Sequence, residues 1–375
     1  MPVDEGAPRP EGFPSDFGQG SGDADAALAL RCLLGITPRD LHELIWREGS
    51  AAASVQAIMA GAAGSDNDRS FLEETTPTHV RRRLDAAGVR FALAGDPEYW
   101  PAFLRLADPP VGLFLRGRPL RLGDRRVAVV GSRRPSKLGI DAARDLGRGL
   151  AASGVVVTSG GAIGIDARAH EGALDAGGTT VAVLGSGIDV EYPATNRALL
   201  REIVQRGTLV SEYPPGVPAE PFRFPARNRL IAGLSIGVVI VEGVARSGTR
   251  STADYASQLG IDVFAVPGPV NSPLTEAPHE LIRDGARLIR GAEDLLDDLG
   301  LESGGAALAS LDGLPPDEGL ALAALIEPML PDAVSRITGL SIPDTVTALI
   351  RLEVRGLVEG VGGRFQRTFR PAAQA

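Results

Sequence analysis

Six short runs of apolar, mostly β-branched residues alternate with helix-like stretches, and this alternation constrains the fold more than any other feature. The apolar runs occupy 127–131, 155–160, 180–187, 207–212, 236–243 and 261–268. Helical patterns lie between most of them, at 139–154, 166–178, 195–207, 227–235 and 251–260. Strands that are apolar throughout are buried on both faces. The pattern therefore predicts an α/β fold with a doubly wound, mainly parallel sheet, in an extended Rossmann-like domain over 96–298.

The segments before this domain predict a tail and a small helical unit. Residues 1–24 are acidic and rich in Pro and Gly, which favours a disordered tail. Residues 25–95 contain short amphipathic helical segments, with a loop expected at 64–76 and a strand at 89–95. The stretch 96–117 is rich in Pro and aromatic residues, and we expect an irregular segment that packs on the sheet domain.

The segments after this domain predict a linker and a second small unit. Residues 299–315 have the composition of a linker, and 316–375 read as three helices and a hairpin that turns at Gly362 and Gly363. Three helices and a hairpin resemble a winged helix-turn-helix. The helix that would enter a DNA groove, 341–353, has an acid near its start and one Arg near its end. A structural or protein-contact role is therefore favoured, and duplex binding stays open as the alternative.

The composition of the chain excludes several classes of protein. Of the 375 residues 44% are apolar and 23% charged, and no apolar stretch reaches the roughly 18 residues of a membrane span. The N-terminal residues lack the basic and apolar regions of a signal peptide. Cys32 is the single cysteine, which excludes an internal disulfide, and one cysteine with four histidines makes a structural zinc site improbable. We therefore predict a cytoplasmic protein with no metal and no cofactor.

The net charge of −9 argues against bulk nucleic-acid binding, but the charge is unevenly distributed. Between residues 116 and 137 a single acid, Asp124, stands among eight basic residues. They are Arg116, Arg118, Arg121, Arg125, Arg126, Arg133, Arg134 and Lys137, the only lysine of the chain. This run is either a solvated basic face or part of a binding site.

Four loops rich in small and hydroxyl residues follow the predicted strands, at 131–139, 159–166, 185–193 and 247–252. In a doubly wound sheet, ligands bind beyond the carboxyl ends of the strands. At least three of these loops run into predicted helix starts, where unpaired N–H groups favour an anion. The loops therefore predict a phosphate-binding rim.

The stretch 224–235, FPARNRLIAGLS, reads as a helix with Pro225 at its first position. Arg227 and Arg229 then fall in the first turn, where the helix dipole disfavours cations. A bound polyanion would offset that cost, and Phe224 could stack on a base. Together these features predict binding of a single-stranded nucleic acid. The alternatives are that Phe224 belongs to the core and that Arg229 is a buried ion-pair partner.

Other classes of site fit the sequence less well. A dinucleotide-binding loop needs a glycine where Arg133 stands, and the P-loop pattern is missing. Asp166 and His170 share a helix face, which favours a packing pair over an acid–base pair. Rossmann-like nucleotide phosphoribohydrolases carry a glutamate where this chain has Thr252. A nucleotide- or phosphoribosyl-binding enzyme stays open as the alternative function, and no catalytic residue is predicted.

Nine motifs in order over about 96–290 resemble the DNA-processing protein A family, the DprA/Smf proteins. They include VAVVGSRRPSKLG, SGGAIGIDARAH, YPATN, SEYPPG, FPARNRLIAGLS, SGTRSTADYA and VFAVPG. The resemblance implies a SAM-like or helix-hairpin-helix N-terminal unit and a winged-helix C-terminal domain. It further implies a non-enzymatic homodimer that binds single-stranded DNA during natural transformation, protects it and loads RecA onto it.

The resemblance also assigns roles to residues of the predicted rim. It places a DNA-contacting role on Arg133 and a stacking role on Phe224. The family often has lysines where this chain has Ala194 and Pro221, and Arg223 or Arg134 could compensate for them. The complete predicted DNA-binding set is Gly131, Ser132, Arg133, Arg134, Lys137, Ser159, Gly160, Phe224, Arg227, Asn228, Arg229, Ser247, Gly248 and Thr249.

Overall fold

The computed structural model describes most of the chain. The described residues are 13, 17–18, 21–121, 123–245, 248–301, 314–325, 328–355 and 357–367. Most of the predicted tail, most of the predicted linker and Ser247 lie outside them. Helix α1 begins at Ser21, so the last four residues of the tail predicted over 1–24 are helical instead.

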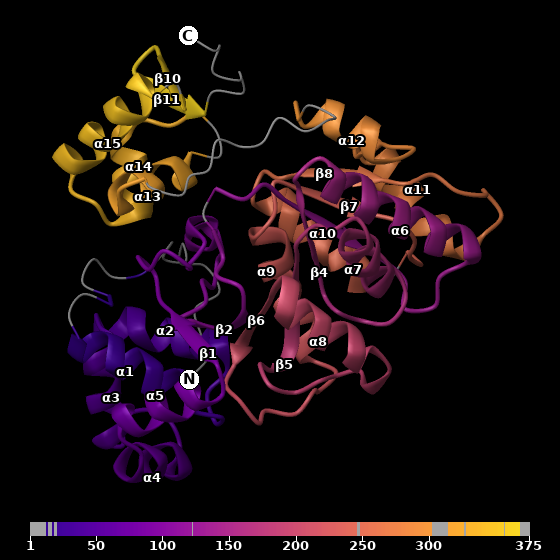
Figure 1. The fold of residues 1–375 in the computed structure, drawn as a ribbon. Helices are drawn as coiled ribbons and strands as arrows, with labels where there is room; N and C mark the ends of the chain where they lie inside the picture. Colours follow the sequence, from indigo (N-terminus) through magenta and orange to yellow (C-terminus); the bar gives the residue numbers. More distant parts are fainter. Residues whose placement is uncertain are drawn as a thin grey trace.

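A nine-stranded sheet forms the centre of the described structure (Figure 1). Its strands are β1 (Val89–Ala92), β2 (Leu113–Gly117), β3 (Arg126–Val130), β4 (Val156–Ser159), β5 (Thr180–Gly187), β6 (Thr208–Tyr213), β7 (Gly237–Ile240), β8 (Asp262–Ala265) and β9 (Arg287–Leu288). The order across the sheet is β1-β2-β6-β5-β4-β3-β7-β8-β9. Strands β3 to β9 run parallel, while β1 and β2 pair antiparallel at one edge. All six predicted strands are present, and the mainly parallel sheet is confirmed.

Helices cover both faces of this sheet because its central strands are apolar on both sides. On β3, Val127 and Val129 face one core with α6 (Lys137–Ala152), α7 (Ile165–Asp175) and α12 (Ala292–Asp298). Ala128 and Val130 face the other core, with α9 (Arg223–Gly233), α10 (Gly248–Gln258) and α11 (Glu276–Arg283). Further helical elements of this domain are α8 (Arg197–Arg206), η2 (Ala194–Asn196) and η3 (Pro273–Thr275). Successive side chains of β3 therefore point alternately into two helix-covered cores, which confirms the doubly wound arrangement.

The predicted irregular segment 96–117 is more ordered than expected. It contains the 3₁₀ helix η1 (Pro101–Arg105) and the strand β2, which pairs with β1 and β6. Leu113 and Leu115 of β2 are fully buried in the same core as η1. The strand predicted at 89–95 forms as β1, but it extends the large sheet, so it is not confined to the helical unit.

Five helices precede the sheet, one more than the sequence patterns predict. They are α1 (Ser21–Arg31), α2 (Pro38–Glu48), α3 (Ala51–Met59), α4 (Asp66–Glu74) and α5 (Pro77–Ala86). Helix α4 lies where a loop was predicted at 64–76, so that prediction is wrong. Ser65 and Asp68 form a reciprocal capping box, in which each side chain accepts a hydrogen bond from the backbone N–H of the other residue. This local signal marks the start of α4, although the apolar pattern of the helix is weak.

The C-terminal unit contains three helices and a hairpin. These are α13 (Pro316–Ala324), α14 (Pro331–Thr338), α15 (Ile342–Val354), β10 (Val358–Val361) and β11 (Arg364–Arg367). The hairpin turns at Gly362 and Gly363, both with left-handed φ, as predicted. Helices α13 and α14 lie against η1 (Figure 1). Likeness to a winged helix stays a prediction, as do the domain boundaries.

None of the helices in the described part of the chain is both long enough and apolar enough to cross a lipid bilayer.

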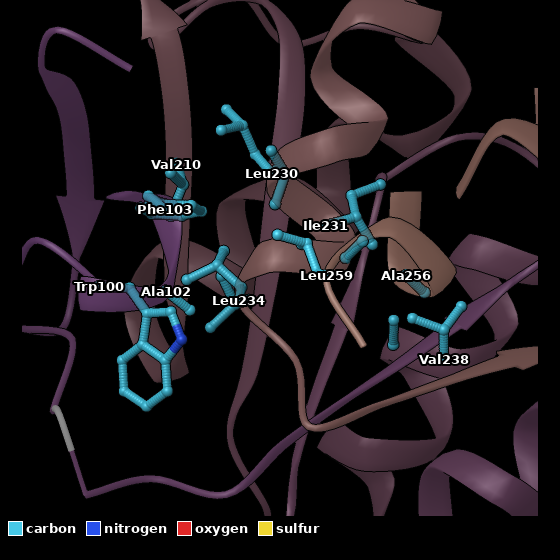
Figure 2. Close-up of a cluster of buried hydrophobic side chains, with 14 of the residues drawn as sticks. Trp100, Ala102, Phe103, Val210, Leu230, Ile231, Leu234, Val238, Ala256 and Leu259 are labelled. Carbon is cyan, nitrogen blue, oxygen red and sulfur yellow. The ribbon is translucent and has the colours of Figure 1, made fainter. Parts of the chain in front are cut away.

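The core beneath α9 holds the helix against the sheet. Figure 2 shows side chains of η1, β6, α9 and α10 gathered in this cluster. Leu230 and Ile231 of α9 are at most 1% exposed there, beside Phe103. This packing fixes the position of a helix whose first turns approach the carboxyl edge of the sheet.

We predict that Leu230→Ala lowers the free energy of unfolding by about 2–5 kcal/mol, because it leaves a cavity in a fully buried cluster. Urea unfolding measures this loss. Leu138→Ala is the matched control, since Leu138 is 65% exposed and its loss should cost less than about 0.5 kcal/mol. Equal effects of the two substitutions would contradict the described packing of α9.

Candidate functional site

A pocket of about 470 Å³ opens at the carboxyl ends of β3 and β7. The chain runs from β3 outward to β4, β5 and β6, then returns to place β7 on the other side of β3. The pocket therefore lies at the point where the strand order reverses, which is where doubly wound sheets bind ligands. The loops after β3 and β7 and the first turns of α9 form its walls.

The structure brings eight of the fourteen predicted site residues together around this pocket. They are Gly131, Ser132, Arg133, Phe224, Arg227, Asn228, Gly248 and Thr249. A side chain at Gly131 would collide with Ile165 and with the carbonyl oxygen of Glu242, about 2.7 and 2.9 Å from the added carbon. Only glycine fits this close packing of the β3 loop against its neighbours.

Two side chains of the pocket lie against the Phe224 ring. The Arg133 guanidinium carbon lies 4.9 Å from the centroid of the Phe224 ring. The Tyr192 ring stacks on Phe224 with centroids 5.6 Å apart and planes 30° apart. Arg133 is exposed and Phe224 is half-buried, so neither belongs to the core. A cation and two rings on one wall can hold an anion and a planar ring together.

Arg227 is a largely buried cation in the lining of the pocket. Its Nη1 donates to the carbonyl oxygen of Gly160 at 2.6 Å and to that of Val183, and its Nε donates to Asn228 Oδ1 at 3.1 Å. A side chain at Gly160 would collide with this guanidinium. Burial lowers the pKa of Arg227 to about 10, although Asp166 nearby opposes the shift. Arg227 therefore stays charged at neutral pH and ties α9 to the end of β4 and the middle of β5.

The start of α9 differs from the sequence expectation. The helix begins at Arg223, with Phe222 as its cap, so Pro225 is the third helical residue and not the first. Arg227 consequently lies in the second turn, where the dipole acts more weakly than at the first. Its cationic charge is stabilised mainly by the carbonyl oxygens and by Asp166.

Arg229 does not reach the pocket. Its Nη1 and Nη2 donate to the two carboxylate oxygens of Glu212 at 2.7 and 2.8 Å, and Asp108 lies 3.1 Å from its Nε. These carboxylates raise its pKa despite burial. The expectation that Arg229 adds free charge to the rim is wrong, and the buried ion-pair alternative is confirmed.

The other predicted residues lie beside the pocket or below it. Arg134 is exposed and outside the lining, and Lys137 is largely exposed and pairs with Asp141 at 2.9 Å. Ser159 is fully buried and donates to the carbonyl oxygen of Val129, so its hydroxyl is not offered to a ligand. Gly160 holds Arg227 without lining the pocket. Ser247 lies outside the described residues.

Tyr192 lines the pocket, but the sequence analysis did not include it in the site. It is 46% exposed and follows β5 in the loop 185–193. That loop is one of the four predicted to form the phosphate-binding rim, so the sequence did indicate that Tyr192 would lie near the site. No single-sequence pattern indicated that its tyrosine would turn toward Phe224.

The buried Asp166 and His170 do not form an acid–base pair. Asp166 accepts from the N–H groups of Gly160 and Ala162, and burial raises its pKa. His170 is fully buried with Nδ1 2.6 Å from Thr180 Oγ1, and burial lowers its pKa to about 3. The imidazole is therefore neutral at physiological pH and packs between α7 and the sheet. Within the described chain, no group of three or more His, Cys, Asp or Glu residues is arranged to hold a metal ion.

The fold and this pocket define a doubly wound α/β protein whose site combines arginines with aromatic rings at the switch point. The DNA recombination-mediator protein A family matches residues 90–300. A DNA processing protein DprA of Mycobacterium tuberculosis is 42% identical over 282 residues, which is 71% of each chain. The chain therefore belongs to this family, the DprA/Smf proteins.

Two solved structures of family members resemble this chain. DNA processing protein A of Streptococcus pneumoniae has a TM-score of 0.64 at 34% identity, covering 74% of this chain and 98% of that one. DNA processing protein A of Helicobacter pylori has a TM-score of 0.51 at 32% identity, covering 56% and 95%. The latter structure concerns the single-stranded DNA binding mode of that protein.

We predict that His170 makes stability fall in acid. The folded protein keeps the imidazole neutral down to about pH 3, whereas the unfolded chain binds a proton near the ordinary value of 6.5. Protons therefore favour unfolding below pH 6.5, by about 1.4 kcal/mol per pH unit. Between pH 7 and 5.5 this group alone should remove about 1.3 kcal/mol.

Urea unfolding of His170→Gln at both pH values measures this contribution, because the variant should lose that part of the pH dependence. His79→Gln is the control, since His79 is an exposed histidine. A His170→Gln protein with the full pH dependence of the wild type would contradict the buried neutral imidazole.

Proposed function

We propose that this protein binds single-stranded DNA in the pocket between β3 and β7 and acts as a recombination mediator. The proposal rests chiefly on the stack of Arg133, Phe224 and Tyr192 in a pocket that also contains the charged Arg227. Guanidinium groups attract phosphates and rings stack on bases without regard to sequence. Membership of the mediator family and the DNA-binding relative support the same assignment.

An acidic chain can bind DNA if its basic groups are concentrated at the site. The net charge is −9, yet the described residues of the pocket lining include Arg133 and Arg227 against one carboxylate, Asp166. Exposed Arg134 follows in the same loop. The Debye length at physiological salt is about 8 Å, so distant surface acids are screened from a phosphate held here.

A nucleotide- or phosphoribosyl-binding enzyme is less well supported. Among the described residues Asp166 is the one carboxylate in the lining, and it accepts from the backbone N–H groups of Gly160 and Ala162 and from the Ser159 hydroxyl, which fix it in place. Thr252 stands where the phosphoribohydrolases carry glutamate. We therefore propose a binding protein and not an enzyme.

The proposal extends to the cellular role implied by the family. The protein would protect single-stranded DNA that enters the cytoplasm during natural transformation and promote loading of RecA for homologous recombination. It would act as a homodimer.

We predict that affinity for oligo-dT depends steeply on salt. If four or five phosphates are neutralised, log K should fall with log salt at a slope of about −3 to −3.5. Arg133→Ala removes one of these contacts, so it should weaken binding about tenfold and make the slope shallower by about 0.7. Fluorescence anisotropy over a salt series measures both quantities.

Arg148→Ala is the matched control for this experiment. Arg148 lies in the last part of α6, pairs with Asp145 and is 52% exposed, so its loss should leave the affinity unchanged. Equal affinities of Arg133→Ala and the wild type would count decisively against the proposed site.

We predict that deleting the residues after Leu314 leaves oligo-dT binding largely intact, because no described residue of the C-terminal unit lines the pocket. Anisotropy of the truncated chain against the full chain measures the change, with circular dichroism as a control for folding. Loss of DNA binding in a folded truncated protein would favour a duplex-binding role for α15 and its hairpin instead.

A further inference from the structure

A second hollow, of about 400 Å³, adjoins the loop that follows β5. Ile188, Val190 and Glu191 of this loop line it, whereas the next residue, Tyr192, lines the switch-point pocket. Residues of α8 and Arg116 of β2 form further walls. The pocket and the second hollow therefore share one short loop.

A more open hollow, of about 590 Å³, continues the second one past the end of β2. The two have Arg116, Val204 and Gln205 in common, so they form one groove, which we call the α8 groove. Part of its lining is apolar, since Leu200 and Leu209 there are at most 3% exposed. The α8 groove thus offers both apolar surface and the basic side chains at its edge.

The charged side chains that line the α8 groove are mostly arginines. Among the described residues they are Arg116, Arg118 and Arg201, against one carboxylate, Glu191. Glu191 pairs with Arg201 at 2.7 Å and with Arg197, also on α8, at 3.0 Å. The hydrogen bond from Arg201 lowers the pKa of Glu191, and the charges of Arg197 and Arg116 act in the same direction. One acid thus stands among several arginines, and the groove keeps an excess of positive charge.

Two of these arginines are available to a ligand. Arg118 is exposed and Arg116 is half-buried, and neither guanidinium group has a hydrogen bond or an ion pair among the described residues. The backbone beside them is fixed, because the Arg118 N–H donates to the carbonyl oxygen of Gly207 at 2.8 Å and the Arg118 carbonyl oxygen accepts from Thr208 Oγ1 at 2.7 Å. A phosphate that binds these groups breaks no existing ion pair.

We propose that the α8 groove is a second binding site for single-stranded DNA, and that it binds the part of the strand that leaves the switch-point pocket. This inference rests on the proposed function and extends the path of the DNA beyond the pocket. Arg116 and Arg118, which begin the basic run 116–137, bind phosphates of that part of the strand. Because Tyr192 and Glu191 are neighbours in the chain, a strand held in the pocket already lies close to the groove. A separate ligand such as an acidic peptide would lack this continuity.

Fluorescence anisotropy with oligo-dT of two lengths tests the proposal. An oligonucleotide of about five nucleotides occupies the pocket alone, whereas one of about twenty also reaches the groove. For the long oligonucleotide, Arg116→Ala should weaken binding about 2- to 10-fold and make the salt slope shallower by about 0.7. Arg116→Ala/Arg118→Ala should roughly double the change in slope. For the short oligonucleotide both variants should match the wild type.

Arg116→Lys separates the charge of this side chain from its packing. The lysine keeps one positive charge, so the salt slope for the long oligonucleotide should return to the wild-type value. Circular dichroism of each variant serves as a control for folding. A lysine variant with the shallow slope of Arg116→Ala would contradict a phosphate contact at this position.

Arg336→Ala is the matched control. Arg336 is exposed in the last turn of α14, and it lines neither the pocket nor the groove. Its loss should leave the affinities for both oligonucleotides unchanged. A loss as large as that in Arg116→Ala would indicate a general effect of surface charge and would overturn the proposal.

The outcomes also distinguish this inference from the proposed function. The groove fails as a DNA site if Arg116→Ala/Arg118→Ala binds the long oligonucleotide as the wild type does, as expected for a groove that takes an acidic peptide. It fails equally if the variant loses the same affinity at both lengths. In both cases the proposed function stands if Arg133→Ala weakens binding of the short oligonucleotide. If the wild type shows no binding that competes with unlabelled poly-dT, both proposals fail together.

Discussion

The candidate site depends on one buried cation, the guanidinium of Arg227. It joins the second turn of α9 to the carbonyl oxygen of Gly160, just after β4, and to that of Val183, within β5. Glycine at position 160 leaves the space that this group needs. Because α9 is also anchored by Leu230 and Ile231 in the core, its first turn is fixed at the sheet edge. Phe224 is thereby held opposite the β3 loop with Arg133.

The two arginines of α9 show how neighbouring identical residues acquire different roles. Arg227 and Arg229 are two positions apart, so their side chains leave the helix in nearly opposite directions. One meets the carbonyl oxygens of Gly160 after β4 and Val183 within β5, and the other meets Glu212 at the end of β6. Burial lowers the pKa of the first, whereas a bidentate carboxylate raises that of the second. The same residue type thus supports the pocket in one case and the packing of α9 in the other.

Much of the fold could be predicted because the relevant signals are local. The six apolar runs appear as strands, and the hairpin turns at Gly362 and Gly363. The secondary-structure predictions were wrong where tertiary contacts or helix caps outweighed the apolar pattern. Strand β2 forms between β1 and β6 in a stretch that reads as irregular, and α4 forms on a capping box with little apolar content.

The sequence by itself determined the doubly wound class and the loops that meet at its switch point, because apolar periodicity and glycine placement act over a few residues. Only the tertiary structure decided which side chains enter the pocket. Ser159 and Arg229 turn into the interior, while Tyr192 turns onto Phe224. The physical reason is that the direction of a side chain depends on partners that are distant in the sequence but close in space, such as Glu212 for Arg229. The spacing of residues along the sequence does not indicate which of them meet in the fold.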